Sequence, residues 1–266
     1  MGSSVDVILL AGDRGPEDPL AVAAGVAGKT LVPVAGCSML AHVTTTLLRW
    51  PRLGRLILLA PTSAPYQQVM AAVQRTLGER LCWLKPEDSL YRSIEAALAV
   101  PPTQPCLLLT ADHVLLNPAW LDSLLAAPVE DQALTLGLAD WDAVMQRFPD
   151  GRRTRYRFRD RSLCGTNLFV LHQLDGVGRI LKVWRSVERE RKKPWRIVSL
   201  LGWGNLGRYL AGRLDSAQAF ALLSARLGAG IQPLLIDDPL AAVDVDSPAD
   251  LTLVERVLAE RGGRTC

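Results

Sequence analysis

Residues 5–12 read Val-Asp-Val-Ile-Leu-Leu-Ala-Gly, and this stretch decides the class of fold. A short, almost continuous apolar run that ends at a glycine is typical of a buried strand in a parallel sheet. Further apolar runs follow, and segments of helical periodicity separate them. This alternation predicts an α/β protein with a mainly parallel sheet between layers of helices.

The same patterns predict the individual elements, and capping residues such as Ser38 and Ser247 mark helix starts. Strands are predicted at 5–11, 55–60, 81–84, 105–111, 133–138, 153–159, 166–171, 231–236 and 241–245. Helices are predicted at 38–49, 64–77, 88–99, 118–125 and 248–260, and residues 176–227 are predicted to be largely helical. We expect residues 1–266 to form a single domain, with an insert at about 140–230 that interrupts one α/β unit.

Composition limits the class of protein. The chain has 266 residues, 49% of them hydrophobic, and a formal net charge of +3. That apolar share is enough for a full core, and the charge is too small to indicate nucleic-acid binding. No apolar run reaches the length of a membrane span, and the N-terminus lacks a signal-peptide pattern. We therefore expect a cytoplasmic protein.

The loop after the first strand is the first candidate site, because ligands of open α/β sheets bind beyond the carboxyl ends of the strands. It begins with Leu10, Ala11 and Gly12, continues through Arg14, and Lys29 lies further on. Backbone N–H groups of a glycine-bearing loop and a lysine ammonium can together bind phosphates. The alternative is an ordinary turn with a surface lysine.

Carboxylates follow two other predicted strands. Asp112 and His113 come directly after residues 105–111, and Asp244 and Asp246 come at the end of residues 241–245. Carboxylate oxygens, together with phosphate oxygens and water, suit Mg²⁺. The alternatives are structural: Asp112 could cap the helix that starts near Pro118, and the residues after Asp244 resemble an ordinary helix start.

Two further patterns have a chemical and a structural interpretation. Residues 202–207 read Gly-Trp-Gly-Asn-Leu-Gly, but another helix is expected to follow without a strand between, so a helix-to-helix turn is favoured over a dinucleotide site. Residues 153–159 place arginine at every second position. Such a strand could contact a polyanion, or its charges could simply protect a sheet edge.

Four motifs in order give a resemblance to the MobA-like nucleotidyltransferases: the Leu-Ala-Gly loop with its lysine, residues 32–43, Thr-Ala-Asp-His at 110–113, and residues 244–251. The resemblance is strongest over 5–50, 85–120 and 240–260, and it implies a Rossmann-like fold of the GT-A type. It also implies residue roles. Leu10, Ala11, Gly12, Arg14 and Ser89 would bind the nucleotide, Lys29 would bind the triphosphate, and Asp112 with Asp246 (or Asp244) would hold Mg²⁺. Asp13 replaces the second glycine that the family usually has.

The reaction implied is transfer of a nucleoside monophosphate from an NTP to an anionic small molecule, with release of pyrophosphate and with Lys29, Arg14 and Asp112 as the catalytic residues. The expected insert supplies candidate acceptor residues, which are Asn167, Lys192, Lys193 and Arg196. Clustered cations suit an anionic acceptor, although they can equally form a solvated helix end. Two alternative functions are a GT-A glycosyltransferase that uses a nucleotide-sugar and a nucleotide-binding protein without catalytic activity.

Overall fold

The computed structural model describes residues 3–12, 17–100, 102–128, 130–187 and 202–262. The chain forms two compact units. The first unit comprises residues 1–121 and 243–266, and the second comprises residues 122–242. Within the described ranges, no helix is long and apolar enough to cross a membrane.

The first unit contains a parallel sheet whose strands lie in the order β6-β1-β4-β5. The strands are β1 (Val5–Leu10), β4 (Leu53–Leu59), β5 (Leu81–Leu84) and β6 (Cys106–Thr110). Strand β1 is central and almost entirely buried, which explains its continuous apolar sequence. The parallel strands and their connecting helices confirm the predicted α/β class.

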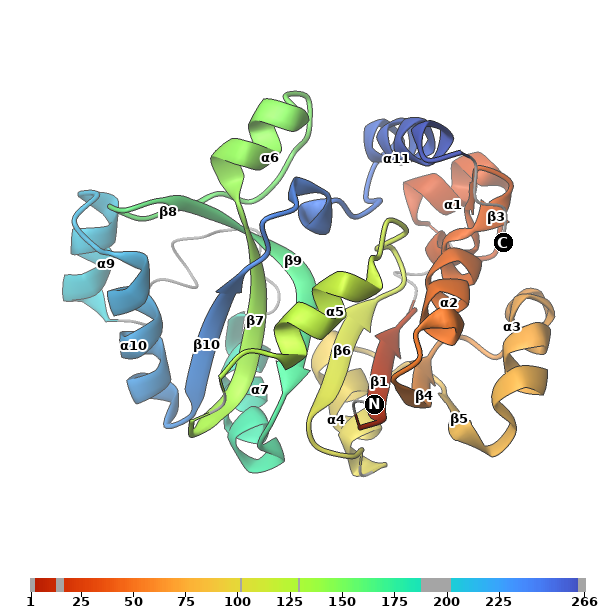
Figure 1. Ribbon diagram of the computed structural model, residues 1–266, viewed down its shortest axis with the longest axis horizontal. Coiled ribbons are helices and arrows are strands. Elements are labelled where there is room, and N and C mark those ends of the chain that lie inside the picture. Colours follow the sequence, from red (N-terminus) through yellow and green to blue (C-terminus); the bar gives the residue numbers. More distant parts are fainter. Residues whose placement is uncertain (1–2, 13–16, 101, 129, 188–201, 263–266) are drawn as a thin grey trace. The chain divides into compact units, whose positions relative to one another are not determined.

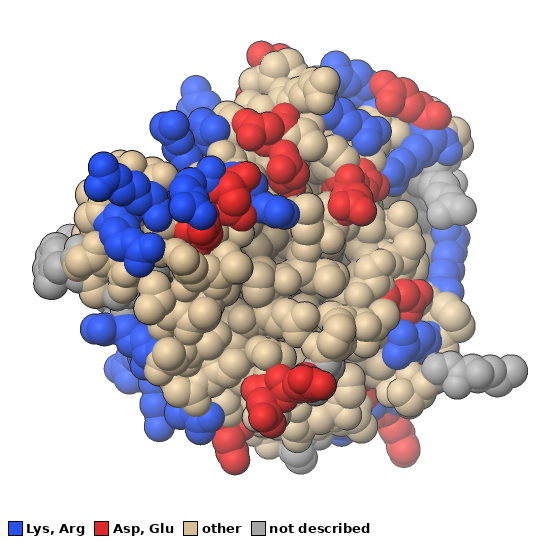
Figure 2. Space-filling model, turned by 60° about the vertical axis from the view of Figure 1, so that its left-hand side comes forward, with Lys and Arg blue, Asp and Glu red and all other residues tan. Residues whose placement is uncertain are grey.

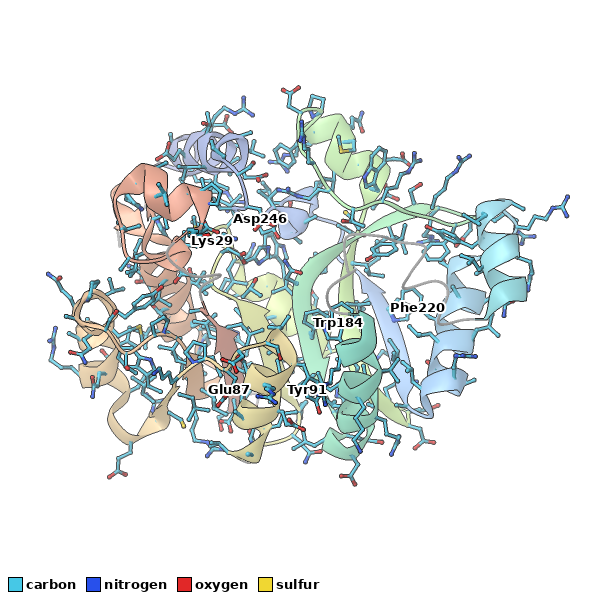
Figure 3. The ribbon with its side chains drawn as sticks, turned by 180° about the vertical axis from the view of Figure 1, so that it is seen from behind. Lys29, Glu87, Tyr91, Trp184, Phe220 and Asp246 are labelled. Carbon is cyan, nitrogen blue, oxygen red and sulfur yellow. The ribbon has the colours of Figure 1, made fainter. Side chains whose placement is uncertain are left out.

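Helices connect these strands, and α2 and α11 begin directly after the predicted capping residues Ser38 and Ser247. They are α1 (Pro19–Ala24), α2 (Met39–Arg49), α3 (Ala64–Leu77), α4 (Leu90–Ala99), α5 (Pro118–Leu125), which runs across the boundary of the unit, and α11 (Pro248–Glu260). Shorter elements are η1 (Lys29–Leu31), η2 (Gly78–Arg80) and the hairpin of β2 (Pro33–Val34) with β3 (Cys37–Ser38). Figures 1 and 3 show α2 and α4 on opposite faces of the sheet. Ser38 caps α2 by accepting a hydrogen bond from the Ala41 amide.

The second unit contains a mixed sheet. Strand β7 (Gln132–Asp140) pairs in parallel with β10 (Gly230–Leu235) and antiparallel with β9 (Ser162–Leu171), which also pairs with β8 (Tyr156–Arg157). The remaining elements are α6 (Trp141–Arg147), α7 (Leu174–Val187), α9 (Trp203–Leu210), α10 (Ser216–Leu227) and η4 (Pro239–Ala242). Side chains of β7, β10, α7 and α10 form a hydrophobic cluster, which holds these two helices on the sheet.

Three predicted segments need correction. The strand predicted at 241–245 is wrong, because residues 239–242 form η4 and the following residues make no strand ladder. The loop after the first strand, in which no helix is predicted, contains α1, which Asp18 caps through the Leu20 amide. Of the alternating segment 153–159, only Tyr156 and Arg157 pair as a strand.

Three of the four arginines of that segment, Arg153, Arg155 and Arg159, bind other protein groups. The Nε atom of Arg153 donates to the Ala242 carbonyl at 2.6 Å. Arg155 lies over the Trp141 ring and donates to Ser162, and Arg159 makes two bonds to Asp215. On the face shown in Figure 2, acidic side chains lie among the basic ones. These contacts favour the structural interpretation of the segment.

The glycine pattern at 202–207 opens helix α9. Gly202 is its N-cap with φ of 92°, and the rest of the pattern lies inside the helix. Residues 211–215 lead directly into α10, and no strand intervenes. The expected second helix without an intervening strand is confirmed, but the pattern itself does not form the predicted helix-to-helix turn, which lies after α9 at Gly212, whose φ is 65°.

Candidate active site

The loop after β1 and the loop after β6 leave the sheet side by side. Leu10 is paired with Thr110 at the ends of the two strands, and the Ala111 amide donates to the Leu10 carbonyl at 2.9 Å. Leu10, Ala11 and Gly12 therefore run beside Thr110, Ala111 and Asp112. This is the carboxyl edge of the sheet, where the order of strands in the chain changes direction.

Lys29 joins the two carboxylates that the sequence singles out. Its Nζ atom lies 2.7 Å from Oδ2 of Asp112 and 2.6 Å from Oδ1 of Asp246. Lys29 is the first residue of η1 and is only 6% exposed. Figure 3 shows Lys29 and Asp246 next to each other. The lysine is thus a buried ammonium between two carboxylates, and the alternative of a surface lysine is wrong.

Two local interactions place Asp246 at this position. The Val245 amide donates to the Asp112 carbonyl at 3.1 Å, which fixes the chain after η4 beside the end of β6. Asp250, which is buried, accepts hydrogen bonds from the Asp246 amide and from the Ser247 hydroxyl. Ser247 in turn caps α11. The predicted helix start is confirmed, and Asp250 has the additional role of orienting Asp246.

The charges of this cluster stabilise each other. Burial by itself lowers the pKa of Lys29, but the carboxylates of Asp112 and Asp246 outweigh burial and raise the pKa above its usual value. Lys29 is therefore a permanent cation at neutral pH. A buried charge is tolerated only when it is paired and hydrogen-bonded, and both conditions are met here.

The structural alternative for Asp112 is excluded by the start of α5. Asn117 provides that cap, since its side-chain oxygen accepts a hydrogen bond from the Ala119 amide at 3.0 Å. The neighbouring His113 is 1% exposed, and its ring packs 5.6 Å from the ring of Trp120. Asp112 is thus available for the site, whereas His113 supports the loop by packing.

Two polar atoms at the end of β6 are buried and have no hydrogen-bond partner among the described residues. They are Oδ1 of Asp112 and Oγ1 of Thr110. Buried polar atoms are usually paired, so these two atoms are candidate ligand contacts. Thr110 belongs to the Thr-Ala-Asp-His motif but is not among the predicted site residues, although a polar residue in an otherwise apolar strand is a signal for one.

The donor set fits a magnesium ion in part. The carboxylates of Asp112 and Asp246 are hard oxygen ligands, and Asp112 has an oxygen without a partner in the described structure. No group of three or more His, Cys, Asp or Glu side chains within the described ranges could hold a metal. This agrees with the usual behaviour of Mg²⁺, which takes one or two carboxylates and completes its shell with water and substrate phosphates.

A comparison with family models decides the relationship. The model described as the MobA-like NTP transferase domain matches residues 7–198. The chain belongs to the MobA-like NTP transferase family. This assignment indicates a nucleotidyltransferase and confirms the resemblance found in the motifs. A comparison with curated proteins gave no match.

Solved structures confirm the Rossmann-like α/β fold of this MobA-like chain. A hypothetical transferase from Thermus thermophilus has a TM-score of 0.73 and 28% sequence identity, with 93% of this chain and 99% of that one covered. The inositol-1-phosphate CTP transferase from T. maritima has a TM-score of 0.61 and 16% identity, with coverage of 100% and 99%. A CMP:2-keto-3-deoxy-manno-octonic acid synthetase complexed with CTP has a TM-score of 0.55 and 15% identity, with coverage of 98% and 100%.

The other predicted nucleotide contacts of the MobA-like chain lie around the first loop. Gly12 packs against Pro86, and a Cβ atom at Gly12 would lie 3.4 Å from the Cβ atom of Pro86. This contact places the segment that leads to Ser89 beside the loop. Ser89 caps α4 by accepting a hydrogen bond from the Arg92 amide, so it has a structural role whether or not it binds the base.

The residues predicted to bind the acceptor lie between positions 167 and 196 of the sequence. Asn167 lies in β9 with φ of 55°, a left-handed conformation that asparagine tolerates better than most residues. The pairing of β7 with β9 is irregular between Leu136 and Leu138, near this residue. Arg14, Lys192, Lys193 and Arg196 lie outside the described residues, as does Asp13.

Proposed function

We propose that this MobA-like chain is a magnesium-dependent transferase that moves a nucleoside monophosphate from an NTP to a phosphorylated or otherwise anionic small molecule. The observation that carries the proposal is the contact of one buried lysine with both Asp112 and Asp246. The contact brings together the three residues to which the family resemblance assigns the phosphates and the metal. They come from distant parts of the sequence, so a chance cluster of surface charges is a poor explanation.

In the proposed reaction an oxygen of the acceptor attacks the α-phosphorus of the NTP. A new P–O bond forms, the bond between the α-phosphorus and its bridging oxygen breaks, and pyrophosphate leaves with the electron pair. Such chemistry depends on positioning and on neutralisation of charge rather than on a protein nucleophile. No general base is required when the acceptor is already a phosphate anion.

The residues would divide this work. The backbone of Leu10, Ala11 and Gly12 would hold the nucleotide, and Lys29 and Arg14 would neutralise charge on the departing pyrophosphate. Asp112 and Asp246 would hold Mg²⁺, which when bound lowers the charge on phosphate oxygens. Asn167, Lys192, Lys193 and Arg196 are the residues proposed for the acceptor.

The first test measures thermal unfolding with ATP, GTP, CTP or UTP, each with Mg²⁺ and with EDTA. A ligand at a hundred times its Kd adds about 2.7 kcal/mol of stability, so a base-selective shift is readily seen. Pyrophosphate release is then measured with the NTP that binds and a panel of phosphorylated acceptors. We expect a Mg²⁺-dependent shift with one NTP and pyrophosphate release with at least one acceptor.

The matched variants are Asp112→Asn and Glu79→Gln. Glu79 is an exposed carboxylate of the same unit, on η2, so its loss controls for charge alone. Asp112→Asn should lower the rate of pyrophosphate release by on the order of 100-fold or more, because a charge-stabilising group is removed. Stabilisation by a nucleotide-sugar and by no NTP would favour the glycosyltransferase alternative. Binding of an NTP without pyrophosphate release under any acceptor would favour the non-catalytic one.

A further inference from the structure

The ammonium of Lys29 lies between Asp112 and Asp246, the two carboxylates that are proposed to hold the metal. It is bonded to Oδ2 of Asp112 and to Oδ1 of Asp246, and the lysine side chain is 7% exposed. The same lysine is expected to contact the triphosphate when the nucleotide binds. The carboxylates take two of the three protons that the ammonium can donate, so in this arrangement at most one is left for the phosphates.

We propose that Lys29 and a divalent cation compete for the carboxylate pair, so that Lys29 keeps the metal out until a nucleotide arrives. This inference rests on the proposed function. Without nucleotide, the ammonium holds Asp112 and Asp246. With the metal and nucleotide together, the carboxylates pass to the metal and the ammonium passes to the phosphates. Lys29 therefore couples metal binding to nucleotide binding.

Charge explains why the two cations exclude each other. The two carboxylates carry two negative charges, and the ammonium neutralises one of them. A divalent ion added to this cluster would leave a net positive charge and would lie close to the ammonium in a site partly withdrawn from water. Repulsion between like charges is strong where the effective dielectric constant is low. The ion is therefore expected to bind well only after the ammonium has left.

The nucleotide changes this balance because it supplies new anions. Its phosphate oxygens can accept the displaced ammonium, so the lysine does not lose its partners when the carboxylates turn to the metal. The coupling is reciprocal, since any ligand that favours the metal-bound arrangement must itself be favoured by the metal. The structure thus predicts weak metal binding by the protein alone.

The direct test measures Mn²⁺ binding by electron paramagnetic resonance in the absence of nucleotide. The proteins are the wild type, Lys29→Met and Lys29→Arg. Met removes the ammonium at similar side-chain length, whereas Arg keeps a cation. We expect Lys29→Met to bind Mn²⁺ about tenfold or more tightly than the wild type, and Lys29→Arg to resemble the wild type, in the range usual for coupled sites. The double variant Lys29→Met with Asp112→Asn should lose the gain.

A second measurement uses the wild-type protein. Lys29→Met leaves two close carboxylates without the ammonium between them, so its Mn²⁺ affinity is interpretable only if the variant folds. The Lys29 ammonium is observed by nitrogen NMR and assigned by its loss in Lys29→Arg. Millimolar Mg²⁺ alone should leave this signal unchanged, and Mg²⁺ with the stabilising NTP should shift it. A shift with Mg²⁺ alone, or equal Mn²⁺ affinity in Lys29→Met and the wild type, would overturn the competition. Both results are compatible with NTP binding and pyrophosphate release, whereas failure of the proposed function would appear as the absence of those two activities in the wild type.

Discussion

The two units of the chain each contain an arginine that makes two hydrogen bonds to an aspartate, but the surroundings differ. In the first unit Arg55 donates to Asp6, whose side chain is 4% exposed and which also accepts hydrogen bonds from the Arg55 and Thr103 amides. In the second unit Arg159 donates to Asp215, and their side chains are 65% and 18% exposed. Each arginine donates two side-chain hydrogen bonds, and the pairs differ in burial and in the two backbone amides that also bind Asp6.

The difference shows where charge matters in this molecule. A buried carboxylate has lost its water, so each hydrogen bond that it accepts is needed for the fold. The charges of an exposed ion pair stay largely hydrated whether or not the pair forms, so the pair contributes little to the free energy of unfolding. The Lys29 cluster follows the first pattern, because its ammonium is buried and bound on two sides. We therefore expect these buried charges to stabilise the first unit, whereas the exposed Arg159 pair contributes little to the second.

The largest loss of stability is expected for Asp6→Asn in the first unit. Asparagine keeps one acceptor but removes the charge that faces Arg55, so we expect a loss of about 3 kcal/mol in the free energy of unfolding at pH 7. Chemical unfolding measured by circular dichroism provides the value. A smaller loss than that caused by Arg159→Gln, which removes the exposed pair, would show that burial does not decide how much each pair contributes to stability.

The pH dependence of the same variant gives an independent check. Burial alone raises the pKa of Asp6, but the hydrogen bonds from Arg55 and Thr103 outweigh burial and lower the pKa below 3.8. Because the folded-state pKa is depressed, the stabilisation is present above pH 3.8 and is lost as the pH falls through the folded-state pKa. The difference between the wild type and Asp6→Asn should therefore shrink as the pH falls below 3.8.

The variant Gly137→Ala tests the second unit through its packing. A Cβ atom at Gly137 in β7 would lie 2.6 Å from Oγ1 of Thr166 and 3.0 Å from the Leu168 carbonyl oxygen. The strands would have to shift, and we expect a loss of about 2 kcal/mol. Gly165→Ala in β9 is the matched control, since nothing lies within 4 Å of its Cβ position. Equal stabilities of the two variants in chemical unfolding would contradict the proposed role of packing.

The smallest effect is expected for Arg159→Gln. The Arg159 side chain is 65% exposed, so loss of its pair with Asp215 should change the free energy of unfolding by less than about 1 kcal/mol. Measurements at low and high salt sharpen the comparison, because salt should weaken this exposed pair more than the Asp6 pair. A loss as large as that of Asp6→Asn would remove the distinction between the units.

The elements that were predicted well are those with local signals at both ends. The helices Ala64–Leu77, Pro118–Leu125 and Pro248–Glu260 and the strand Leu81–Leu84 have the bounds expected from the sequence. A proline at or near the first helical position and a cap residue before it define the start of such a helix whatever surrounds it. The six residues of α1 were missed because a helix so short shows no periodicity.

The elements that were predicted wrongly depend on partners elsewhere in the chain. The alternation at 153–159 is a strand pattern, but only Tyr156 and Arg157 find a backbone partner in β9. The side chains of Arg153, Arg155 and Arg159 bind Ala242, Ser162 and Asp215. The apolar residues at 241–245 are buried without forming a strand. In both segments the local pattern reports burial or exposure correctly and does not report hydrogen-bond partners.

For the candidate site, the residues could be predicted from the sequence but their contacts could not. The sequence by itself determined the α/β class and singled out Lys29, Asp112 and Asp246, because strand periodicity, glycine and capping residues act over a few positions, although of the three only Asp112 follows a strand. Only the tertiary structure decided that one ammonium bonds both carboxylates, across 83 and 217 positions of sequence. It also decided that Asp250 orients Asp246 and that the buried hydroxyl of Thr110 has no hydrogen-bond partner in the described part of the chain. Such contacts depend on closure of long loops around a packed sheet, and no local pattern encodes which groups then meet.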